Sequence, residues 1–391
     1  MSAVALTVRT TSADQHARWL RSRPSVSFLQ LPSWADVKVG WRTESVGWFD
    51  GDRQVGAALI LHRPVPKVRR RSLAYIPEGP VLDWTGTSGW SVSEWLQPLL
   101  EHCKAVGAFQ VKMGPPVASR RWEAGTVKKA LADAESEAWN APTSLDRVAA
   151  DWHSTSASQV VDALRAGGWQ QETSSGAGFG DVQPRYVYCI PLEDRSLDDV
   201  FVGFNQQWRR NIRKAEKSGV QVRLGTREDL TDFHRVYVET AERDKFTPRG
   251  QVYFERMWDA LNGASPNNDG YHELTLHLAE YDGHLAAATI MIRVGDRAWY
   301  SYGASTTADR DVRPSNALQW HMITRAHEAG CRVYDLRGIS ATLDPANHLI
   351  GLVRFKVGSG GYAQEYVGEW DYPLRPVWAR AFAAYQRRGL S

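Results

Sequence analysis

The strongest concentration of charged side chains in the sequence is a basic stretch over residues 204–219. Apolar residues recur there at helical spacing, at Phe204, Trp208, Ile212 and Ala215. Five cations oppose a single acid, Glu216, and these are Arg209, Arg210, Arg213, Lys214 and Lys217. The pattern predicts a helix with a basic face, which suits a phosphate backbone because each neutralised phosphate releases counterions. A solvated helix face is the alternative, and periodicity alone does not separate the two.

Other kinds of chemistry are limited by what the sequence lacks. Its three cysteines, Cys103, Cys189 and Cys331, are widely spaced and form no CxxC pair. Their odd number and spacing argue against a disulfide framework and a zinc cluster, and fit a reducing cytosol. The sequence offers neither a convincing nucleophile elbow nor an HExxH helix, so we expect no covalent enzyme intermediate, no metal and no cofactor.

Length and composition favour two packed domains. The chain has 391 residues, 43% of them hydrophobic, and single cores usually stop growing beyond ~250 to 300 residues. The net charge is only +3, so any basic site must be local. Residues 1–15 lack the apolar core of an export signal, and no window approaches ~18 uninterrupted apolar residues. We expect a cytoplasmic protein whose membrane contact, if any, is peripheral.

An internal duplication supplies the elements that would position a site. Residues 48–61 and 280–292 each predict a strand, an Asp-Gly turn with the positive φ angles of a type I′ hairpin, and a second apolar strand. Helical patterns then end at Gly107 in the first half and Gly330 in the second, and a strand follows each. The turns are 232 residues apart and the glycines 223. A third pair of similar segments lies at 164–172 and 358–365.

Each copy is predicted to contain a hairpin, a third strand, a helix, a strand, a second helix and a final strand. Helices on a largely antiparallel sheet favour an α/β (α+β) fold of two tandem GNAT-like (acetyltransferase-like) domains over a doubly wound parallel sheet. We expect the domains at residues 1–183, with 368–391 packing back on them, and at 184–367. The run 118–158, rich in Ala, Ser and Glu, is expected to be an insertion in the first copy.

The acyl donor is not expected to be coenzyme A. Acetyltransferases hold its pyrophosphate with an (R/Q)xxGx(G/A) turn ahead of the central helix. Neither half has this turn, and residues 310–316 stand where the second half should carry it. Pro314 in this segment suits the first position of a helix. The scaffold is therefore predicted to serve a different acyl donor.

Short motifs are spread over nearly the whole chain, at residues 219–222, 300–305, 314–320, 334–338 and 351–358. Together with the basic helix they resemble the FemABX aminoacyltransferases, which build the peptide cross-bridges of peptidoglycan. Residues 29–38 are similar to the N-terminal signature of that family. The resemblance runs from about residue 28 to 372 and implies two GNAT-like lobes. No heptad insertion is present, so the chain resembles the short, FemX-like branch without a coiled-coil arm.

The resemblance implies transfer of an amino acid from aminoacyl-tRNA to the side-chain amine of a peptidoglycan stem peptide. Glycine is expected, and alanine and serine are the alternatives. The acceptor would be lipid II or UDP-MurNAc-pentapeptide, and the product an interpeptide bridge. Such an enzyme must hold amine and ester together and stabilise the tetrahedral oxyanion. It is expected to act as a cytoplasmic monomer, whose contact with the inner face of the plasma membrane, if any, is peripheral.

The resemblance also implies roles for single residues. Lys356 matches the family's lysine near the reaction centre, where a cation would stabilise the developing negative charge. Lys38 matches a lysine that clamps the precursor's diphosphate, and further precursor contacts match Arg249, Tyr253 and Tyr302. The five cations of the basic helix are expected to bind tRNA. For each residue alone, a surface lysine or a core tyrosine is the competing interpretation.

Two questions stay open at the level of sequence. Several relatives place an Asp after the strand that matches residues 111–113, but here Gly114 follows, so the general base is unassigned. A substrate phosphate, a neutral incoming amine or Asp335 could serve. The acceptor could also be an antibiotic or another small amine, and an acyl-CoA N-acyltransferase or a non-enzymatic RNA-binding module are the alternatives from other classes.

Overall fold

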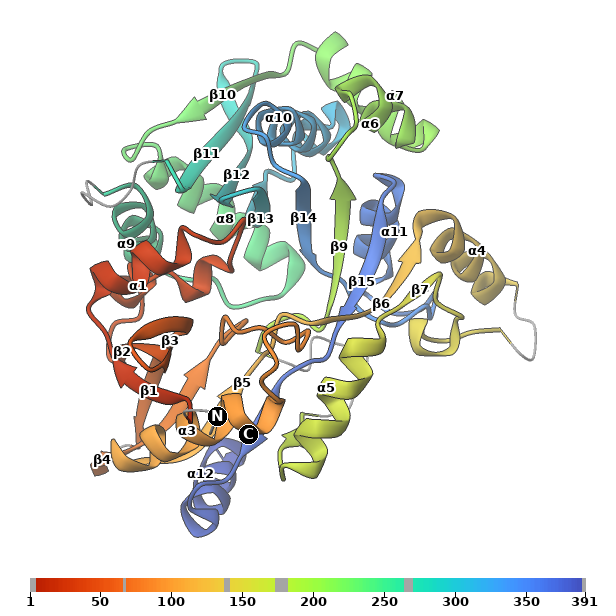
Figure 1. Cartoon of the computed structure of the whole chain (residues 1–391). Coiled ribbons are helices and arrows are strands. Elements are labelled where there is room, and N and C mark those ends of the chain that lie inside the picture. Colours follow the sequence, from red (N-terminus) through yellow and green to blue (C-terminus); the bar gives the residue numbers. More distant parts are fainter. Residues whose placement is uncertain (1–4, 66–67, 137–140, 173–181, 264–269, 389–391) are drawn as a thin grey trace. The chain divides into compact units, whose positions relative to one another are not determined.

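The computed structural model describes residues 5–65, 68–136, 141–172, 182–263 and 270–388 (Figure 1). The chain folds into two compact units. The first comprises Met1–Arg120, Trp152–Arg185 and Glu365–Ser391, and the second comprises Arg121–Asp151 and Tyr186–Gln364. The chain therefore crosses between the units four times. Residues 121–151, which the sequence assigns to the first domain, group with the second unit.

The first unit is built on a seven-stranded sheet. Its strands lie in the order β1 (Thr7–Thr10), β2 (Arg42–Asp50), β3 (Arg53–Val65), β4 (Val68–Ile76), β5 (Ala108–Met113), β16 (Trp370–Tyr372) and β8 (Gln170–Gln171). Strands β4 and β5 run parallel, and the other pairs are antiparallel. Strand β16 comes from the far end of the sequence and pairs with both β5 and β8.

Helices cover this sheet, and they are α1 (Ala13–Leu20), α2 (Trp34–Val37), α3 (Val92–Ala105), α5 (Thr155–Ala166) and α12 (Pro376–Arg388). Helix α3 begins at a capping box in which Ser91 and Glu94 bond each other's backbone N–H groups. Its Trp95 and Leu99 pack in one core with Trp48 of β2. The Trp48 indole also donates to the Trp95 carbonyl at 2.7 Å, so helix and sheet are joined by burial and by a hydrogen bond.

The second sheet has nine strands. Their order is β10 (Gln221–Gly225), β11 (His272–Tyr281), β12 (His284–Val294), β13 (Arg297–Ser305), β14 (Val333–Gly338), β9 (Tyr186–Pro191), β15 (Tyr362–Tyr366), β6 (Ala118–Glu123) and β7 (Trp152–His153). Strands β13 and β14 run parallel, as β4 and β5 do in the first sheet. The two sheets share one strand order from β1 to β5 and from β10 to β14, which confirms the predicted duplication.

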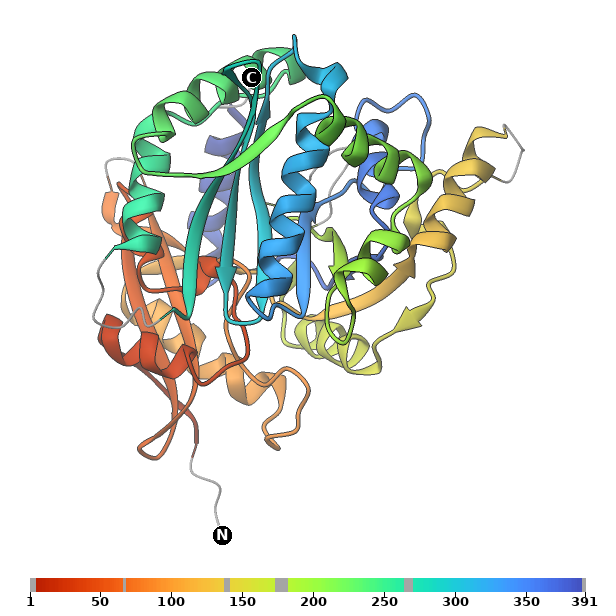
Figure 2. The same ribbon diagram turned by 90° about the horizontal axis from the view of Figure 1, so that it is seen from above.

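The remaining helices belong to the second unit: α4 (Ala124–Glu135), α6 (Leu197–Gly203), α7 (Gln206–Lys217), α8 (Leu230–Asp244), α9 (Gln251–Asn262), α10 (Pro314–Glu328) and α11 (Ile350–Gly358). Figures 1 and 2 show α10 along one face of the sheet and α8 and α9 along the other. Helix α10 starts with Pro314, as predicted. Among the described residues no helix is both long and apolar enough to span a membrane, and no group of His, Cys, Asp or Glu could hold a metal ion.

The two predicted hairpin turns differ in detail. Asp282 and Gly283 both have positive φ, 49° and 76°, as a type I′ turn requires. In the first hairpin Asp50 is the last residue of β2, and Gly51 has the positive φ of 61°. The type I′ prediction is therefore wrong for the first hairpin, because its turn lies one residue later. Both helix-ending glycines are confirmed, with φ of 93° at Gly107 and 74° at Gly330.

Candidate functional site

The parallel strands β13 and β14 separate at their carboxyl ends. Over the described residues they pair through three positions, from Arg297 with Val333 to Trp299 with Asp335. Strand β13 continues to Ser305, and β14 continues to Gly338 while it pairs with β9 along its other edge. A bulge in the β12–β13 pairing lies beside Tyr302. Bulges re-aim side chains next to active sites, and the end of parallel strands is a frequent place for a ligand.

Lys356 lies at this end of β14. It projects from α11 and is only 3% exposed. Its Nζ donates to the carbonyls of Leu336 and Gly338, each at 2.7 Å. Burial lowers the pKa of Lys356 to about 7, against the opposing charge of Asp335. The amine is thus held in one position and can exist both charged and neutral near neutral pH.

Asp335 stabilises the backbone conformation at the end of β14. Its carboxylate, in a residue 1% exposed, accepts from Arg297 Nη2 at 2.6 Å and from the Arg337 backbone N–H at 2.6 Å. Arg337 has a φ of 61°, which a side chain rarely adopts without such support. Both carboxylate oxygens are therefore engaged in structure, which disfavours Asp335 as the general base.

The structure brings together three of the residues expected to contact the precursor. Arg249 lies over the ring of Tyr253, with 4.7 Å from its guanidinium carbon to the ring centroid. The hydroxyl of Tyr253 is 3.1 Å from that of Tyr302. Arg249 is exposed, whereas both tyrosines are half-buried. A cation supported by two phenols offers donors for an anionic or carbonyl group.

Aromatic residues that the sequence did not single out surround this group. Phe254 lies 5.1 Å and Tyr237 lies 6.2 Å from the ring of Tyr302, measured between centroids. Phe254 is fully buried, and Tyr237 is 6% exposed. Aromatic residues at helical spacing on α8 and α9 are indistinguishable from core residues in a sequence. In the structure both rings pack against Tyr302, which lies beside the bulge.

Lys38 belongs to the first unit, where it ends the short helix α2. Its Nζ lies 5.9 Å from the ring centroid of Trp34, and the residue is half-buried. Trp34 is 2% exposed and packs edge-on against Phe28. The aromatic pair fixes the backbone from which the lysine extends, so the side chain of Lys38 starts from a fixed position.

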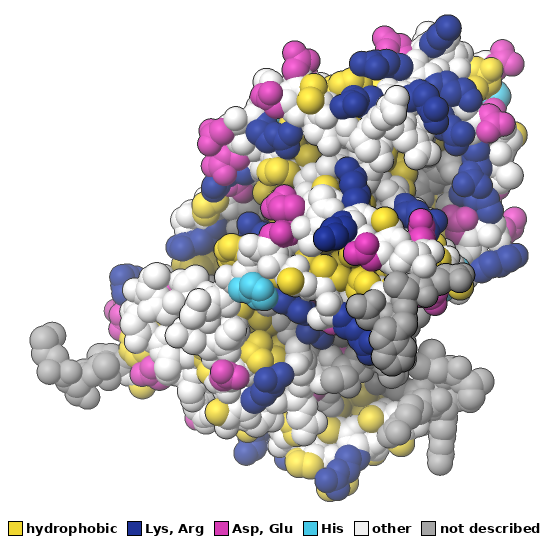
Figure 3. Space-filling view, turned by 90° about the vertical axis from the view of Figure 1, so that its right-hand side faces the viewer, with side chains coloured by type: hydrophobic (Ala, Val, Ile, Leu, Met, Phe, Trp, Pro, Cys, Tyr) yellow, Lys and Arg dark blue, Asp and Glu magenta, His cyan; other side chains and the backbone are white. Residues whose placement is uncertain are grey.

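The predicted basic helix is confirmed as α7. Asn205 caps its N-terminus, accepting from the Trp208 backbone N–H at 2.8 Å. The predicted apolar stripe is buried, and its members are Phe204, Trp208, Ile212 and Ala215. Of the five cations, Arg209 is half-buried and donates to the Val202 carbonyl, while the exposed ones are Arg210, Arg213, Lys214 and Lys217. Lys and Arg side chains gather at the upper end of the face drawn in Figure 3, where α7 lies.

Helix α7 is joined directly to α11, the helix that carries Lys356. The Trp208 indole donates to the Phe355 carbonyl at 2.8 Å, and the two rings lie 4.7 Å apart. The Asn205 backbone N–H donates to Gly358 at 2.9 Å. A Cβ at Gly358 would come within 2.7 Å of the Trp208 ring, so glycine permits this close approach. The basic face and the buried lysine are therefore parts of one packed assembly.

Comparison with known proteins gives a consistent result. The chain matches the FemAB family over residues 11–265 and an acetyltransferase (GNAT) domain over residues 203–346. It is 25% identical to a lipid II:glycine glycyltransferase of Staphylococcus epidermidis and 26% identical to one of Staphylococcus aureus. Each alignment covers 92% of this chain and 91% of the relative.

Solved structures agree on the fold. The crystal structure of FemX matches with a TM-score of 0.76 at 23% identity, covering 96% of this chain and 99% of that one. A tandem GNAT protein from the clavulanic acid biosynthesis pathway matches with a TM-score of 0.50 at 12% identity, over 94% and 98% of the two chains. The predicted tandem GNAT-like fold is confirmed. This protein therefore belongs to the FemAB family.

Proposed function

We propose that this protein transfers glycine from glycyl-tRNA to the side-chain amine of the stem peptide in a peptidoglycan precursor, forming an interpeptide bridge. The relatives aligned over nearly their whole length are glycyltransferases that act on lipid II. The observation that carries the chemistry is the buried amine of Lys356, held by two carbonyls beside the diverging ends of β13 and β14.

The reaction is aminolysis of an ester. The acceptor amine forms a bond to the ester carbonyl carbon, the bond to the tRNA ribose oxygen breaks, one proton leaves the amine, and the leaving ribose oxygen takes up one proton. Two N–H groups of Lys356 are fixed by carbonyls, so its third position is directed elsewhere. In the neutral form this position holds a lone pair that takes the amine's proton, and the ammonium group formed in this way then donates a hydrogen bond to the oxyanion.

The other candidate residues take binding roles in this proposal. Arg249, Tyr253 and Tyr302 would hold the acceptor, and Lys38 would bind its diphosphate. The exposed cations of α7 would bind the RNA backbone. We further propose that the protein works as a monomer in the cytoplasm, with peripheral contact at the inner face of the membrane, where a lipid-linked acceptor lies.

Purified protein, charged tRNAs and a lysine- or diaminopimelate-containing precursor, followed by mass spectrometry, test the proposal. We expect a mass increase of one glycine on the precursor. Lys356→Met should lower the transfer rate about a hundredfold or more, because one oxyanion donor is worth that much. Lys129→Met, an exposed lysine on α4, is the control. The proposal is contradicted if no charged tRNA donates an amino acid to the precursor, or if Lys356→Met keeps full activity.

A further inference from the structure

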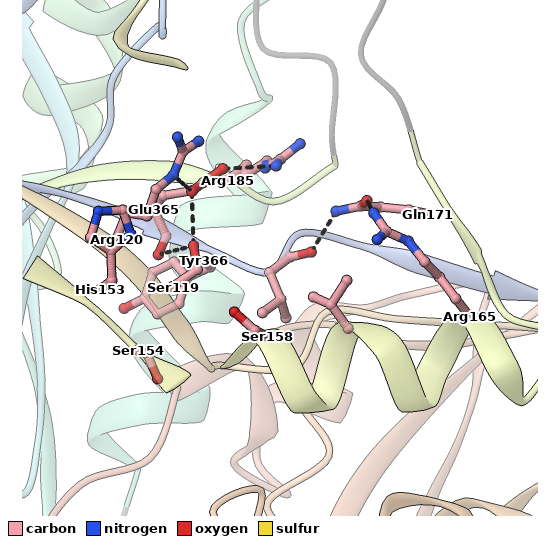
Figure 4. Close-up of a pocket in the computed structure, with 12 residues that line it drawn as sticks. Ser119, Arg120, His153, Ser154, Ser158, Arg165, Gln171, Arg185, Glu365 and Tyr366 are labelled. Carbon is pink, nitrogen blue, oxygen red and sulfur yellow. Dashed lines mark hydrogen bonds and ion pairs between the residues drawn. The ribbon is translucent and has the colours of Figure 1, made fainter. Parts of the chain in front are cut away.

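A polar cavity of about 250 Å³ lies beside α5 in the first unit (Figure 4). None of its lining residues has a role in the proposed transfer. We call it the α5 cleft, and the residues that matter here are Ser119, Arg120, Ser154, Ser158, Arg165, Arg185 and Glu365. All of them belong to the first unit.

A buried carboxylate organises one wall of the α5 cleft. Glu365 is 2% exposed and accepts from Arg120 Nε at 2.5 Å, Arg185 Nη2 at 2.7 Å and the Ser119 hydroxyl at 2.8 Å. Burial alone would raise the pKa of Glu365, but the hydrogen bond from Arg120 and the charges of both arginines keep it below its ordinary value. Glu365 is therefore ionised, and it sets the orientation of two guanidinium groups that line the cavity (Figure 4).

Helix α5 forms another wall. Ser154, Ser158 and Arg165 lie on one face of it, at i, i+4 and i+11, over a length of about 16 Å. Ser154 is the N-cap and accepts from the Ala157 backbone N–H at 3.1 Å, so the positive end of the helix dipole lies at the cavity. The wall offers two hydroxyls and a cation along one line.

Basic side chains outnumber acidic ones in the described lining of the α5 cleft. It contains three arginines and one glutamate, and Asp162 lies 4.0 Å from Arg165 on the exposed side of α5. We propose that the α5 cleft binds a compact phosphate group, such as the diphosphate of a small organic ester, through Arg120, Arg165 and Arg185. Guanidinium forks and hydroxyls are the usual donors to phosphate oxygens.

A compact phosphate fits this site better than an RNA strand does. Two of the three arginines converge on the single carboxylate of Glu365, so their charges meet at one point. A nucleic-acid backbone instead presents charges in a row and is matched by an extended basic surface. The α5 cleft is also formed without any residue of α7, so binding there is independent of the proposed transfer reaction.

Titration of the full-length protein with inorganic pyrophosphate at low ionic strength, followed by calorimetry, tests the inference. Ser158→Glu places a carboxylate in the α5 cleft and should weaken binding about tenfold or more, because like charges in contact repel. Gln159→Glu adds the same charge to the same helix at a residue outside the lining, and should leave binding within about twofold. Both positions are exposed, so neither change disturbs the core.

Lys38→Met separates this site from the proposed acceptor site. If Lys38→Met loses pyrophosphate binding while Ser158→Glu retains it, the anion binds at the acceptor site and the inference is overturned. Equal weakening by Ser158→Glu and Gln159→Glu overturns it as well. Displacement of pyrophosphate by a short RNA duplex, sensitive to Ser158→Glu, would contradict a compact ligand. Pyrophosphate binding that survives in Lys356→Met would support the α5 cleft even if no transfer activity is found.

Discussion

Lys356 is the side chain whose protonation should shape the pH dependence of transfer. Its pKa is lowered to about 7 by burial, whereas a free acceptor amine has a pKa near ~10.4. Only neutral amines attack esters, and only neutral Lys356 can accept the proton. The logarithm of the single-turnover rate should therefore rise with pH at a slope of about one above pH 7 and about two below it.

Rapid-quench measurements on preformed complexes check this pH profile. Lys356→Gln keeps a polar group but cannot titrate, so it should retain the slope of about one at every pH and lose the break near pH 7. The same break in Lys356→Gln and in the native protein would show that another group is the base.

A second pair of titratable residues should contribute to the loss of folding stability in acid. His277 and His321 lie 2.9 Å apart between their Nδ1 atoms, and the Thr275 hydroxyl lies 2.9 Å from His277 Nε2. Burial lowers the pKa of His277 to about 3, with His321 and Arg325 adding repulsion, and burial also lowers the pKa of His321. Below the unfolded pKa of about 6.5 the unfolded chain binds protons that the folded chain does not.

Stability should therefore fall as pH drops from about 6.5 toward 3. His277→Asn keeps a hydrogen-bonding group and should flatten the dependence of Tm on pH in this range. His284→Asn is the control, because the hydrogen bond that the exposed His284 donates to Asp309 raises the pKa of His284, and its contribution to stability has the opposite sign. Thermal melts over this range check the prediction, and an unchanged slope in His277→Asn would refute it.

At the scale of elements, the basic face of α7 can be tested for RNA binding against the alternative that it is only a solvated helix surface. Arg210 and Lys214 are exposed and one turn apart. Replacing both with Gln should weaken tRNA binding and reduce the slope of log K against log salt by about one to two, because each phosphate contact contributes about 0.7 to 0.9. Fluorescence anisotropy at several salt concentrations measures both.

The matched control is Lys128→Gln with Lys129→Gln on α4, which removes the same charge from another exposed helix face. If both double variants reduce affinity and slope equally, the effect is one of net charge and α7 has no special role.

The duplication was predictable because its signals are local. Asp-Gly turns, helix-ending glycines and apolar periodicity each act within a few residues, so they locate both hairpins and the helices α3 and α10, although the first turn lies one residue later than predicted. The strand exchange was not predictable. Strand β16 enters the first sheet from more than 250 residues away, and no periodicity records a pairing partner. The grouping of residues 121–151 with the second unit was not predictable either, because it also depends on contacts between distant parts of the sequence.

The candidate site was also predictable only in part. Lys356, Arg249, Tyr253 and Tyr302 were found through motifs of the family, and the contact of the two tyrosines follows from their places on α9 and β13. The burial of Lys356 could not be foreseen, because a lysine in a short helix is ordinarily exposed. The α5 cleft was also invisible, since Arg120 and Glu365 are 245 residues apart.

At the scale of the whole molecule, the stability of the first sheet should depend on strand β16 from the C-terminal segment. Trp370 of β16 is fully buried in the core of that unit, and the strand pairs on both sides. A chain that ends at residue 368 should lose amide protection in β5 and β8 while β11 to β13 stay protected, because each sheet has its own core. Hydrogen exchange read by mass spectrometry resolves the two sheets.

A chain that ends at Leu374 keeps β16 and lacks α12, so it isolates the strand from the helix. Protection of β5 in this longer chain and its loss in the shorter one is the expected result. Full protection of β5 in both would mean that the strand is dispensable.

The late position of β16 also bears on synthesis by the ribosome. Domains usually fold in order from the N-terminus as the chain emerges, but Trp370 is made 257 residues after Met113, its partner in β5. The first sheet therefore stays incomplete, with β5 and β8 not joined by β16, until residues 370–372 have been synthesised. Unpaired strand edges recruit other chains, so premature stop codons before residue 370 should give aggregates instead of a partly working enzyme.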